Sequence, residues 1–589
     1  MKKVLRQLVL CCALLAADTP SIAAPIQWQP WSDAAFERAR QENRFVLLDL
    51  EAVWCHWCHV MDQETYGNPE VQAMIEQHFI AIRVDQDARP DLARRYEDYG
   101  WPATIVYGPD GKEIVKRSGY IAPAPFNNLL NAIRADPSPV KYRDSEPVTQ
   151  YSVSALLAEE LRETLKKQIV DSHDFKLGGL RQQQKFMDRD IVEYALEMAR
   201  GGDRQARRIA VQTLDGALNL IDPVWGGVYQ YSTHGDWKHA HFEKIMFVQA
   251  DYMRVYALAG QQLGDTRYLK AARDIYRYVD AFLRSPEGAY YVSQDADLVK
   301  GQHSEDYFAL GDAQRRTRGI PAIDQHLYAR ENGWMMQGLA ALYAADGNAE
   351  ILARAVAAAR WTLAHRALPG GGFRHGEVDA AGPYLEDTLA VGRGFLALYQ
   401  VTGDREWLSH AQAAAIFIRA SFSNGERAGF VTAAPGKSGF EPMPQTDENI
   451  MQARFANLLA RYTGDAGLRE DAQRAMRFLV TKEIALRRRT EAGLLIADRE
   501  LSNDPVHLTV VGSKDDAAAR ELFRAAQRKA GAYKRIEWWD RGEGPMPNPD
   551  VQYPELPKAA AYVCSNNRCS LPVFEGKALL SLAERLAAN

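Results

Sequence analysis

The residues with the clearest chemistry in this sequence are two cysteines three positions apart, in the motif Cys55-His56-Trp57-Cys58. They follow the apolar run Phe45–Leu50, which is typical of a buried strand, and they would open the helix that comes next. Unpaired backbone N–H groups and the helix dipole stabilise a thiolate at that position, and a thiolate is the species that attacks a disulfide. We therefore expect Cys55 to be the exposed nucleophile and Cys58 to resolve the mixed disulfide.

Two neighbours of the cysteines bear on this chemistry, and two other interpretations stay open. When charged, His56 would favour the thiolate and make the disulfide more oxidising. Pro102, in the pair Trp101-Pro102, opens a later hairpin that would lie beside the sulfurs. The first alternative is a static structural disulfide. The second is c-type haem attachment through Cys55-x-x-Cys58-His59 with His59 as axial ligand, which the strand and proline pattern does not favour.

Composition and charge exclude some functions and favour export. The chain has 589 residues, 47% of them hydrophobic, and a formal net charge of −5, so we expect several domains and no nucleic-acid partner. Lys2 and Lys3 precede a short apolar run, Val4–Ala17, and small residues follow at Ser21 and Ala23. This pattern predicts a removed signal peptide over residues 1–23, a periplasmic or secreted protein, and no stable membrane insertion afterwards.

Four cysteines remain after the predicted signal peptide, in two close pairs. Export permits disulfides, although a chain of this size does not need them for stability. For the second pair, Cys564 and Cys569, we expect a local disulfide. The alternatives are electron exchange with Cys55 and Cys58, and zinc held by all four sulfurs.

The elements around the first pair form an alternating α/β unit over residues 26–136. Its expected helices and strands are helix 33–42, strand 45–50, the helix that carries the cysteines, helix 69–78, and strands 79–85, 103–107 and 113–117. This order resembles thioredoxin, in which the proline before the later hairpin is cis. A cis peptide at Pro102 would leave the backbone beside the sulfurs free to pair with a substrate strand.

After a Pro-rich and polar linker, residues 137–150, the chain over 151–500 is a helical repeat. Gly-Asp or Gly-Asn turns separate helix-period segments, and each later helix is followed by a glycine with an aromatic or apolar residue. Eleven helices can be counted, with the twelfth left to a chain end, and the natural closed form is an (α/α)6 toroid. Residues 505–589 predict a small α/β segment that packs on the toroid, with strands 506–511 and 559–563 and helices 515–529 and 574–587.

The repeat also predicts which end of the toroid carries a site. If the Gly-Asp turns share one face, the inner helices all begin on the opposite face, and their positive ends converge there. Residues suited to binding or acid–base chemistry gather in those connections: Trp225, Tyr231, His241, Glu243, Lys244, Asp295, Asp297, Glu386 and Asp387.

Each of these residues has a functional and a structural interpretation. His241 and Glu243 suit acid–base work on a sugar, with the four other carboxylates beside them. The carboxylates could instead cap helices, Lys244 could brace the next helix, and Trp225 and Tyr231 could plug the mouth rather than stack on a sugar. His239, His241 and Glu243 alternate as metal ligands can, but no further ligand with suitable spacing is evident, so we expect no metal and no cofactor.

Several motifs resemble the spermatogenesis-associated protein 20 family (DUF255) along nearly the whole chain. They are Trp54-Cys55-His56-Trp57-Cys58-His59-Val60-Met61, Val84-Asp85-Gln86-Asp87-Ala88-Arg89-Pro90-Asp91, Gly100-Trp101-Pro102, Lys185-Phe186, Gly226-Gly227-Val228-Tyr229, His241-Phe242-Glu243-Lys244, Asp295-Ala296-Asp297, and Cys564 with Cys569. The resemblance implies a thioredoxin-like domain followed by a toroid similar to that of glycosidases and N-acylglucosamine 2-epimerases.

The leading hypothesis is an exported thiol–disulfide oxidoreductase whose toroid binds a client. Its partners would be protein thiols or disulfides, and a carbohydrate is a further partner to consider. The alternatives are a carbohydrate-active enzyme, an epimerase or hydrolase at the toroid mouth, and a scaffold without catalysis. Which way electrons flow is set by a reduction potential.

Overall fold

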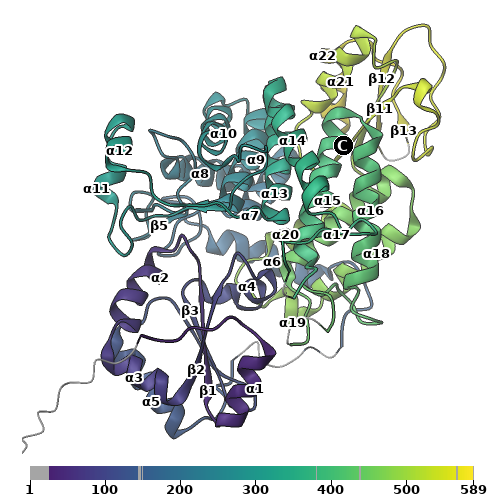
Figure 1. Ribbon diagram of the computed structural model, residues 1–589. Helices are drawn as coiled ribbons and strands as arrows, with labels where there is room; N and C mark the ends of the chain where they lie inside the picture. Colours follow the sequence, from purple (N-terminus) through teal and green to yellow (C-terminus); the bar gives the residue numbers. More distant parts are fainter. Residues whose placement is uncertain are drawn as a thin grey trace, which may run out of the picture.

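The computed structural model describes residues 25–142, 148, 150–379, 381–436, 440–565 and 568–587. The predicted signal peptide, part of the predicted linker, and residues 566 and 567 between the second cysteine pair lie outside these residues. Three units follow one another along the chain, with a helical ring between two smaller α/β domains (Figure 1). Within the residues described, no helix combines the length and the apolar character needed to cross a membrane.

The N-terminal domain is built on a four-stranded sheet in the order β2-β1-β3-β4. Strand β1 pairs in parallel with β2 and antiparallel with β3, and its apolar run is buried because helices cover both faces of the sheet. The Trp101–Pro102 peptide bond before β3 is cis, as the thioredoxin resemblance implied. The elements are α1 (Asp33–Glu42), β1 (Phe45–Glu51), α2 (His56–Met61), α3 (Pro69–His78), β2 (Phe79–Asp85), α4 (Pro90–Tyr96), β3 (Ala103–Tyr107), β4 (Glu113–Ser118) and α5 (Pro123–Ala135).

The middle of the chain forms two concentric layers of helices. The inner helices are α7 (Arg189–Arg200), α9 (Met246–Leu263), α13 (Ala329–Asp346), α15 (Leu385–Thr402), α17 (Thr446–Thr463) and α20 (Ala492–Ser502); the outer ones are α6 (Glu159–Ser172), α8 (Arg204–Ala217), α10 (Thr266–Tyr278), α14 (Ala349–His365), α16 (Arg405–Phe422) and α18 (Ala466–Leu479). Each inner helix contacts the next, and α20 returns to α7, so the ring closes. The predicted (α/α)6 toroid is confirmed, with twelve main helices rather than the eleven that the sequence let us count.

The expected hairpin turns join five of the inner helices to their outer partners. Gly264 ends α9 in the left-handed region, with φ of 66°, and the side chain of Asp265 then accepts the backbone N–H of Arg267 to begin α10. The same pairing recurs between α13 and α14, α15 and α16, and α17 and α18. The sixth pair has no such turn, because its helices, α20 and α6, come from opposite ends of the repeat and meet only on closure.

The C-terminal domain repeats the sheet of the N-terminal domain. Its strands are β10 (Val506–Val511), β11 (Lys534–Trp539), β12 (Ala560–Ser565) and β13 (Arg568–Cys569), in the order β11-β10-β12-β13. As with β1, the central strand β10 is parallel to one neighbour and antiparallel to the other. Helices α21 (Ala517–Gln527) and α22 (Gly576–Ala587) complete a second thioredoxin-like order, with Gly512-Ser513-Lys514-Asp515 where the first domain has its cysteines.

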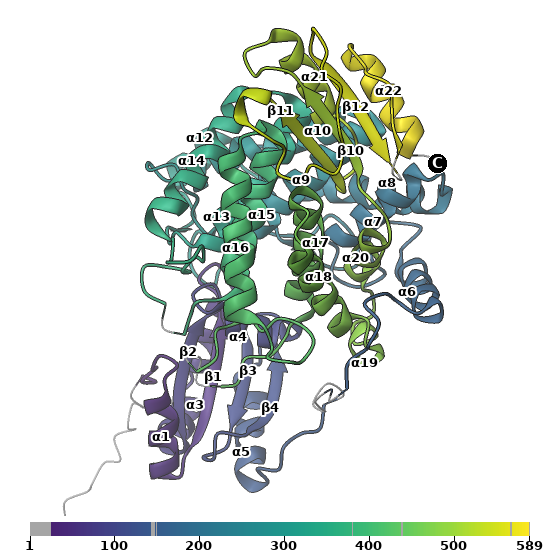
Figure 2. The ribbon, with the colours of Figure 1, turned by 90° about the vertical axis from the view of Figure 1, so that its right-hand side faces the viewer.

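The two small domains cover opposite ends of the ring (Figures 1 and 2). The C-terminal domain sits on the Gly-Asp turns: Lys514 Nζ donates to the carbonyl of Gly403 at 2.8 Å, and Arg524 Nη2 to that of Gly347 at 3.0 Å. The N-terminal domain sits on the other end, where the inner helices begin. The cysteine motif therefore faces the mouth of the ring.

Candidate active site at the mouth of the ring

The strand–helix junction holds the two cysteines as the sequence predicts. Cys55 is the N-cap of α2, and the backbone N–H of Cys58 points at Cys55 Sγ over 3.1 Å. The two sulfurs form a disulfide. Both side chains are buried, and Cys55 is only 4% exposed. The sequence predicted an exposed nucleophile, but in the structure Cys55 is buried, and its surroundings decide what can reach it.

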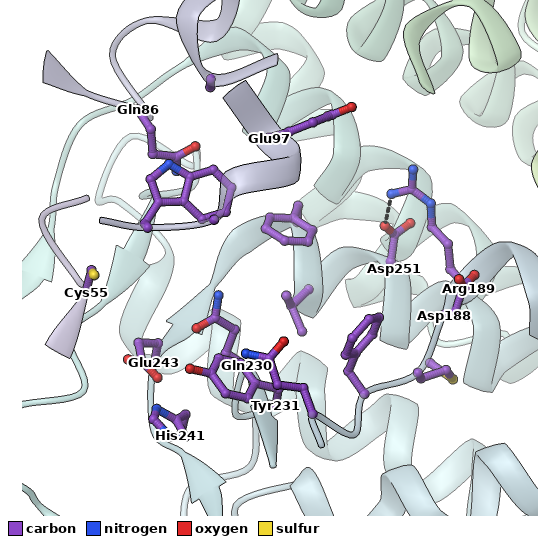
Figure 3. A pocket seen from close by; sticks show the side chains of 18 of the residues that line it. Cys55, Gln86, Glu97, Asp188, Arg189, Gln230, Tyr231, His241, Glu243 and Asp251 are labelled. Carbon is purple, nitrogen blue, oxygen red and sulfur yellow. Dashed lines mark hydrogen bonds and ion pairs between the residues drawn. The ribbon is translucent and has the colours of Figure 1, made fainter. Parts of the chain in front are cut away.

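Cys55 lies on the wall of a large cavity of about 1540 Å³ between the N-terminal domain and the ring. Cys55, His56 and Trp57 line it from one side, and residues from the beginnings of the inner helices line it from the other. Figure 3 shows Cys55, Glu243 and His241 together on one flank, with Asp188, Arg189 and Asp251 across the cavity. A reactant that reaches the sulfur of Cys55 through this cavity thus contacts both units.

A carboxylate from the ring fixes both histidines of the cysteine motif. Asp297 accepts a hydrogen bond from His56 Nδ1 at 2.7 Å and another from His59 Nδ1 at 3.0 Å. Burial opposes ionisation of Asp297, but the hydrogen bonds from these two histidines lower its pKa to about 2. The ring therefore presents a permanent negative charge to the helix that carries the cysteines.

Both ring nitrogens of His59 face acceptors, which bears on the two metal-based alternatives. Its Nε2 lies 3.1 Å from the carbonyl of Val53 and its Nδ1 faces Asp297, so both nitrogens face acceptors. Although burial lowers the pKa of His59, the hydrogen bond to Asp297 and the charge of Asp295 raise it overall. His59, Asp295 and Asp297 place three ligand atoms within 4.8 Å of one another. A doubly protonated imidazole cannot ligate, so this group would bind a metal or haem iron only after losing a proton.

Glu243 is a ring residue that contacts the backbone at the start of α2. Its Oε1 lies 3.4 Å from the backbone nitrogen of His56, the residue after Cys55. Its Oε2 is buried and has no hydrogen-bond partner among the described residues. Burial raises the pKa of Glu243 to about 7. A carboxyl group with this pKa beside a sulfur nucleophile can take or give a proton near neutral pH.

His241 and Tyr231 form the wall next to Glu243. Their rings stack with centroids 4.4 Å apart, on the short paired strands β5 (Tyr231–Ser232) and β6 (Ala240–His241). Burial lowers the pKa of His241 to about 4, so the imidazole is neutral at pH 7. His241, Glu243 and Tyr231 therefore do share a cavity, as the sequence suggested, and the cavity also contains Cys55.

Glu386 lines the same cavity but is held by two arginines. It pairs with Arg94 of α4 and with Arg330 of α13, whose Nη1 is 3.3 Å away. Burial opposes ionisation, yet the charges of Arg94 and Arg330 lower the pKa of Glu386. Arg330 also reaches Asp87 of the N-terminal domain at 3.2 Å. Glu386 thus serves to dock the two units, and the structure does not support the acid–base role considered for it.

Four other residues predicted for the site do not line the cavity. Lys244 is fully buried against Asp222 at 2.8 Å, and burial lowers its pKa to about 8. Trp225 donates to Asp312 at 2.6 Å, behind the same cluster. Asp387 accepts from the backbone of Arg330 and from His375 Nδ1 at 2.9 Å. Asp295 is also not on the cavity wall; its side chain accepts the backbone N–H of Asp297 and so shapes the loop that holds the histidines.

The structure brings two further residues to the site: Asp87, which had no functional role assigned from the sequence, and His303, which belongs to the polar residues expected at this end of the ring. Asp87 accepts from Trp54 Nε1 at 2.7 Å beside the cysteines and also binds Arg330. His303 lies with its ring centroid 4.2 Å from that of His56. Asp87 belongs to the motif Val84–Asp91, which carries the family resemblance. That motif was the signal in the sequence that could have identified Asp87 as a site residue.

The second cysteine pair is a local disulfide between β12 and β13. It lies in the C-terminal domain, across the ring from Cys55 (Figure 1). The four sulfurs are therefore not gathered around a common metal, and direct exchange between the two disulfides would require the domains to leave the ring.

Comparisons with known proteins agree with this architecture. Residues 19–135 match the family model Thioredox_DsbH, described as "Protein of unknown function, DUF255". Human spermatogenesis-associated protein 20 is 23% identical in an alignment covering 94% of this chain and 89% of that protein; the mouse protein is 28% identical over 46% of this chain and 39% of its own length. The family resemblance stated from the motifs is thereby confirmed.

Two further likenesses concern the separate units. The thiol:disulfide interchange protein DsbD 1 of Pseudomonas aeruginosa is 34% identical over 112 residues, 17% of this chain and 19% of that protein. The alignment with the solved structure of cellobiose 2-epimerase from Bacillus thermoamylovorans covers 54% of this chain and 86% of the epimerase chain. The identity is 11% and the TM-score is 0.43. At that score the likeness carries no argument about a substrate.

Proposed function

We propose that this chain, a relative of spermatogenesis-associated protein 20 with a DUF255 domain, is a thiol–disulfide oxidoreductase that acts on a substrate enclosed between its N-terminal domain and its ring. The observation that carries the proposal is the position of Cys55, buried from bulk solvent but lining a cavity of about 1540 Å³. The likeness of the cysteine-bearing region to a thiol:disulfide interchange protein supports the same chemistry.

The exchange balances in two steps. A substrate thiolate attacks Cys55 Sγ; the bond between Cys55 and Cys58 breaks, and its electron pair leaves on Cys58 Sγ. A second substrate thiolate then attacks the substrate sulfur of the mixed disulfide, which releases Cys55 as a thiolate and the substrate as a disulfide. The reverse sequence reduces a substrate disulfide and leaves Cys55 and Cys58 oxidised.

The residues around Cys55 have separate roles in these steps. The backbone N–H groups at the start of α2 stabilise the Cys55 thiolate. Glu243 takes the proton from an incoming thiol or returns it to a departing one. Asp297 positions His56 and His59 and keeps α2 against the ring.

Trapping of the mixed disulfide tests the proposal. In a Cys58→Ser variant the intermediate on Cys55 cannot be resolved internally, so mass spectrometry of the protein incubated with a disulfide should find a covalent adduct at Cys55. The Cys55→Ser variant should form no adduct and turn over no disulfide. Unchanged turnover by Cys55→Ser would refute the proposal.

A second candidate function is a carbohydrate-active enzyme at the same mouth. It is favoured by the neighbouring His241 and Glu243, whose pKa values are shifted in opposite directions, to about 4 and about 7. Loss of sugar turnover in His241→Ala, with Cys55→Ser unaffected, would favour this candidate. A scaffold role would follow if neither substitution altered any activity.

We also propose export to an oxidising compartment, the periplasm or the exterior. The proposal rests on the charged and apolar pattern of residues 1–23, and the two disulfides are compatible with it. N-terminal sequencing of the protein from an exporting host should find a start near residue 24. A full-length protein retained in the cytoplasm would contradict it.

A further inference from the structure

Between the large cavity and the smaller cavity beneath the C-terminal domain lies a polar layer that the repeat places at one level of the ring. The ninth residue of five inner helices contributes to it: Arg254 of α9, Gln337 of α13, Arg393 of α15, Arg454 of α17 and Glu500 of α20. Eight residues of α-helix rise about 12 Å, so the layer lies about that far below the end of the ring that faces Cys55.

Most of the charges in this layer are neutralised by one another. Arg454 Nε bonds Glu500 at 3.0 Å, and Arg454 also pairs with Glu193 of α7. Arg254 Nη1 bonds Glu193 at 2.6 Å. Arg254 Nε also lies 3.9 Å from Asp251 Oδ1, so Arg254 and Arg454 both have carboxylate partners within ion-pair distance.

Arg393 differs from its neighbours in this layer. Among the described residues no carboxylate lies within ion-pair distance of it, and its Nη1 contacts the sulfur of Met451 at 2.9 Å. The nearby Asp251 is bonded to Arg189 at 2.5 Å. Burial, followed by the charges of Arg454 and Arg254, lowers the pKa of Arg393 to about 9.

Arg393 is also open to a ligand. It lines the large cavity that contains Cys55, and it lines a smaller cavity of about 150 Å³ beneath the C-terminal domain. A cation on a cavity wall without a counter-charge is costly by itself, and it becomes favourable when a ligand supplies the anion.

We infer that Arg393 binds a carboxylate of the molecule whose sulfur reacts with Cys55, so that the substrate is an anionic thiol or disulfide extended enough to reach both residues. This inference rests on the proposed exchange at Cys55. The ring then selects the substrate through the Arg393 guanidinium, which binds the carboxylate far below the sulfur. A short peptide with a free C-terminus and a small carboxylated thiol share this chemistry.

A series of cysteine peptides tests the inference. Oxidised peptides Cys-(Gly)n, with n from 0 to 4 and with either a C-terminal carboxylate or an amide, are equilibrated with the reduced Cys58→Ser protein. The Cys55 thiolate attacks one peptide sulfur, the peptide disulfide breaks, and the second peptide leaves as a thiolate with the electron pair. Mass spectrometry then measures the equilibrium constant of each mixed disulfide.

The carboxylate form should be favoured over the amide by about ten-fold or more, the scale of a hydrogen bond to a charged group. Arg393→Met should remove this preference, and Arg393→Lys, which keeps the charge, should retain part of it. The preference should be absent at n of 0 and should appear as n grows, because Arg393 lies about 12 Å below the end of the ring that faces Cys55. That dependence on n supports the anchor.

Two results would overturn the inference while leaving the proposed function intact: equal constants for acid and amide, or a preference that Arg393→Met does not change. Absence of every adduct from the folded protein would instead refute the exchange itself. Thermal unfolding of ligand-free Arg393→Met gives a separate check. Because the variant loses an uncompensated charge, its Tm should stay equal or rise, whereas a clear fall would assign Arg393 a structural role.

Discussion

Asp297 accepts a hydrogen bond from Nδ1 of His56 at 2.7 Å, so a carboxylate of the ring holds the residue that stands between the two cysteines. The two residues are 241 positions apart in the chain. The contact joins the redox motif to the ring and is the most direct evidence that the two units form one site. The Asp297→Asn variant should therefore disturb both stability and exchange.

We expect Asp297→Asn to lower the free energy of unfolding by about 1.5–3 kcal/mol, the contribution of a hydrogen bond to a charged group. The Tm from thermal unfolding measures this. Asp306→Asn is the matched control, because Asp306 is exposed and pairs only at the surface with Arg318; it should leave Tm unchanged. Equal effects of the two substitutions would contradict the role given to Asp297.

The stabilising effect of this contact should depend on pH in a defined direction. The pKa of Asp297 is lowered from 3.8 to about 2, so its contribution is present above pH 4 and is lost as the pH falls toward 2. The pKa of His59 is raised above 6.5, so its contribution is complete below pH 6.5 and is lost as the pH rises through the raised value. The Tm difference between wild type and Asp297→Asn should be largest between about pH 4 and 6.5. A difference that widens at higher pH would contradict this assignment.

Glu243 should control the pH dependence of exchange. Its carboxylate form, which accepts a proton, predominates above its pKa of about 7, so the rate at Cys55 should rise through that pH. Glu243→Gln keeps an acceptor for the backbone of His56 but removes the titrating group; we expect a loss of about 10²-fold and no rise near pH 7. Stopped-flow kinetics across pH measure both. Glu305→Gln, on an exposed part of the cavity wall, should behave as wild type.

The second disulfide should be structural. Replacing both Cys564 and Cys569 by Ala opens a loop closed over five positions and should cost about 2 kcal/mol. Exchange at Cys55 should be unchanged, because the two disulfides lie in domains on opposite sides of the ring (Figure 2). Exchange rates of the double variant that fell below one tenth of wild type, with the N-terminal domain still folded, would indicate an electron relay.

Local signals in the sequence located most of the elements. Helix α1 over Asp33–Glu42 and strand β2 over Phe79–Asp85 agree with prediction to the residue, because their apolar periods and end signals are clear. Strand β11 was missed because Lys534-Arg535-Ile536-Glu537 does not look buried. In the structure Glu537 is fully buried and is bonded by His507 and Arg535. Pairing across strands, which no local window contains, makes that burial possible.

The sequence predicted several residues of the candidate site, but it did not predict that the N-terminal domain and the ring together enclose that site. The repeat placed His241, Glu243 and Asp297 at one end of the ring, and the motif placed Cys55 at the start of a helix. Nothing in either pattern says that the N-terminal domain covers that end, because this depends on contacts such as Arg94 with Glu386. Lys244 failed as a site residue for a related reason: its buried partner Asp222 gives it a structural role that spacing alone does not reveal.

The reactivity of Cys55 toward reagents of different size shows whether an ionised sulfur is enclosed at the mouth of the ring. The protein is reduced and exposed at pH 7 to iodoacetamide or to a maleimide carried on a long polyethylene glycol chain, and peptide mapping gives the rate at each cysteine. We expect rapid alkylation of Cys55 ahead of Cys58 by iodoacetamide, and much slower labelling by the large reagent. A Cys55 that resists iodoacetamide, or one that reacts equally fast with both reagents, would contradict an ionised sulfur enclosed at the mouth of the ring.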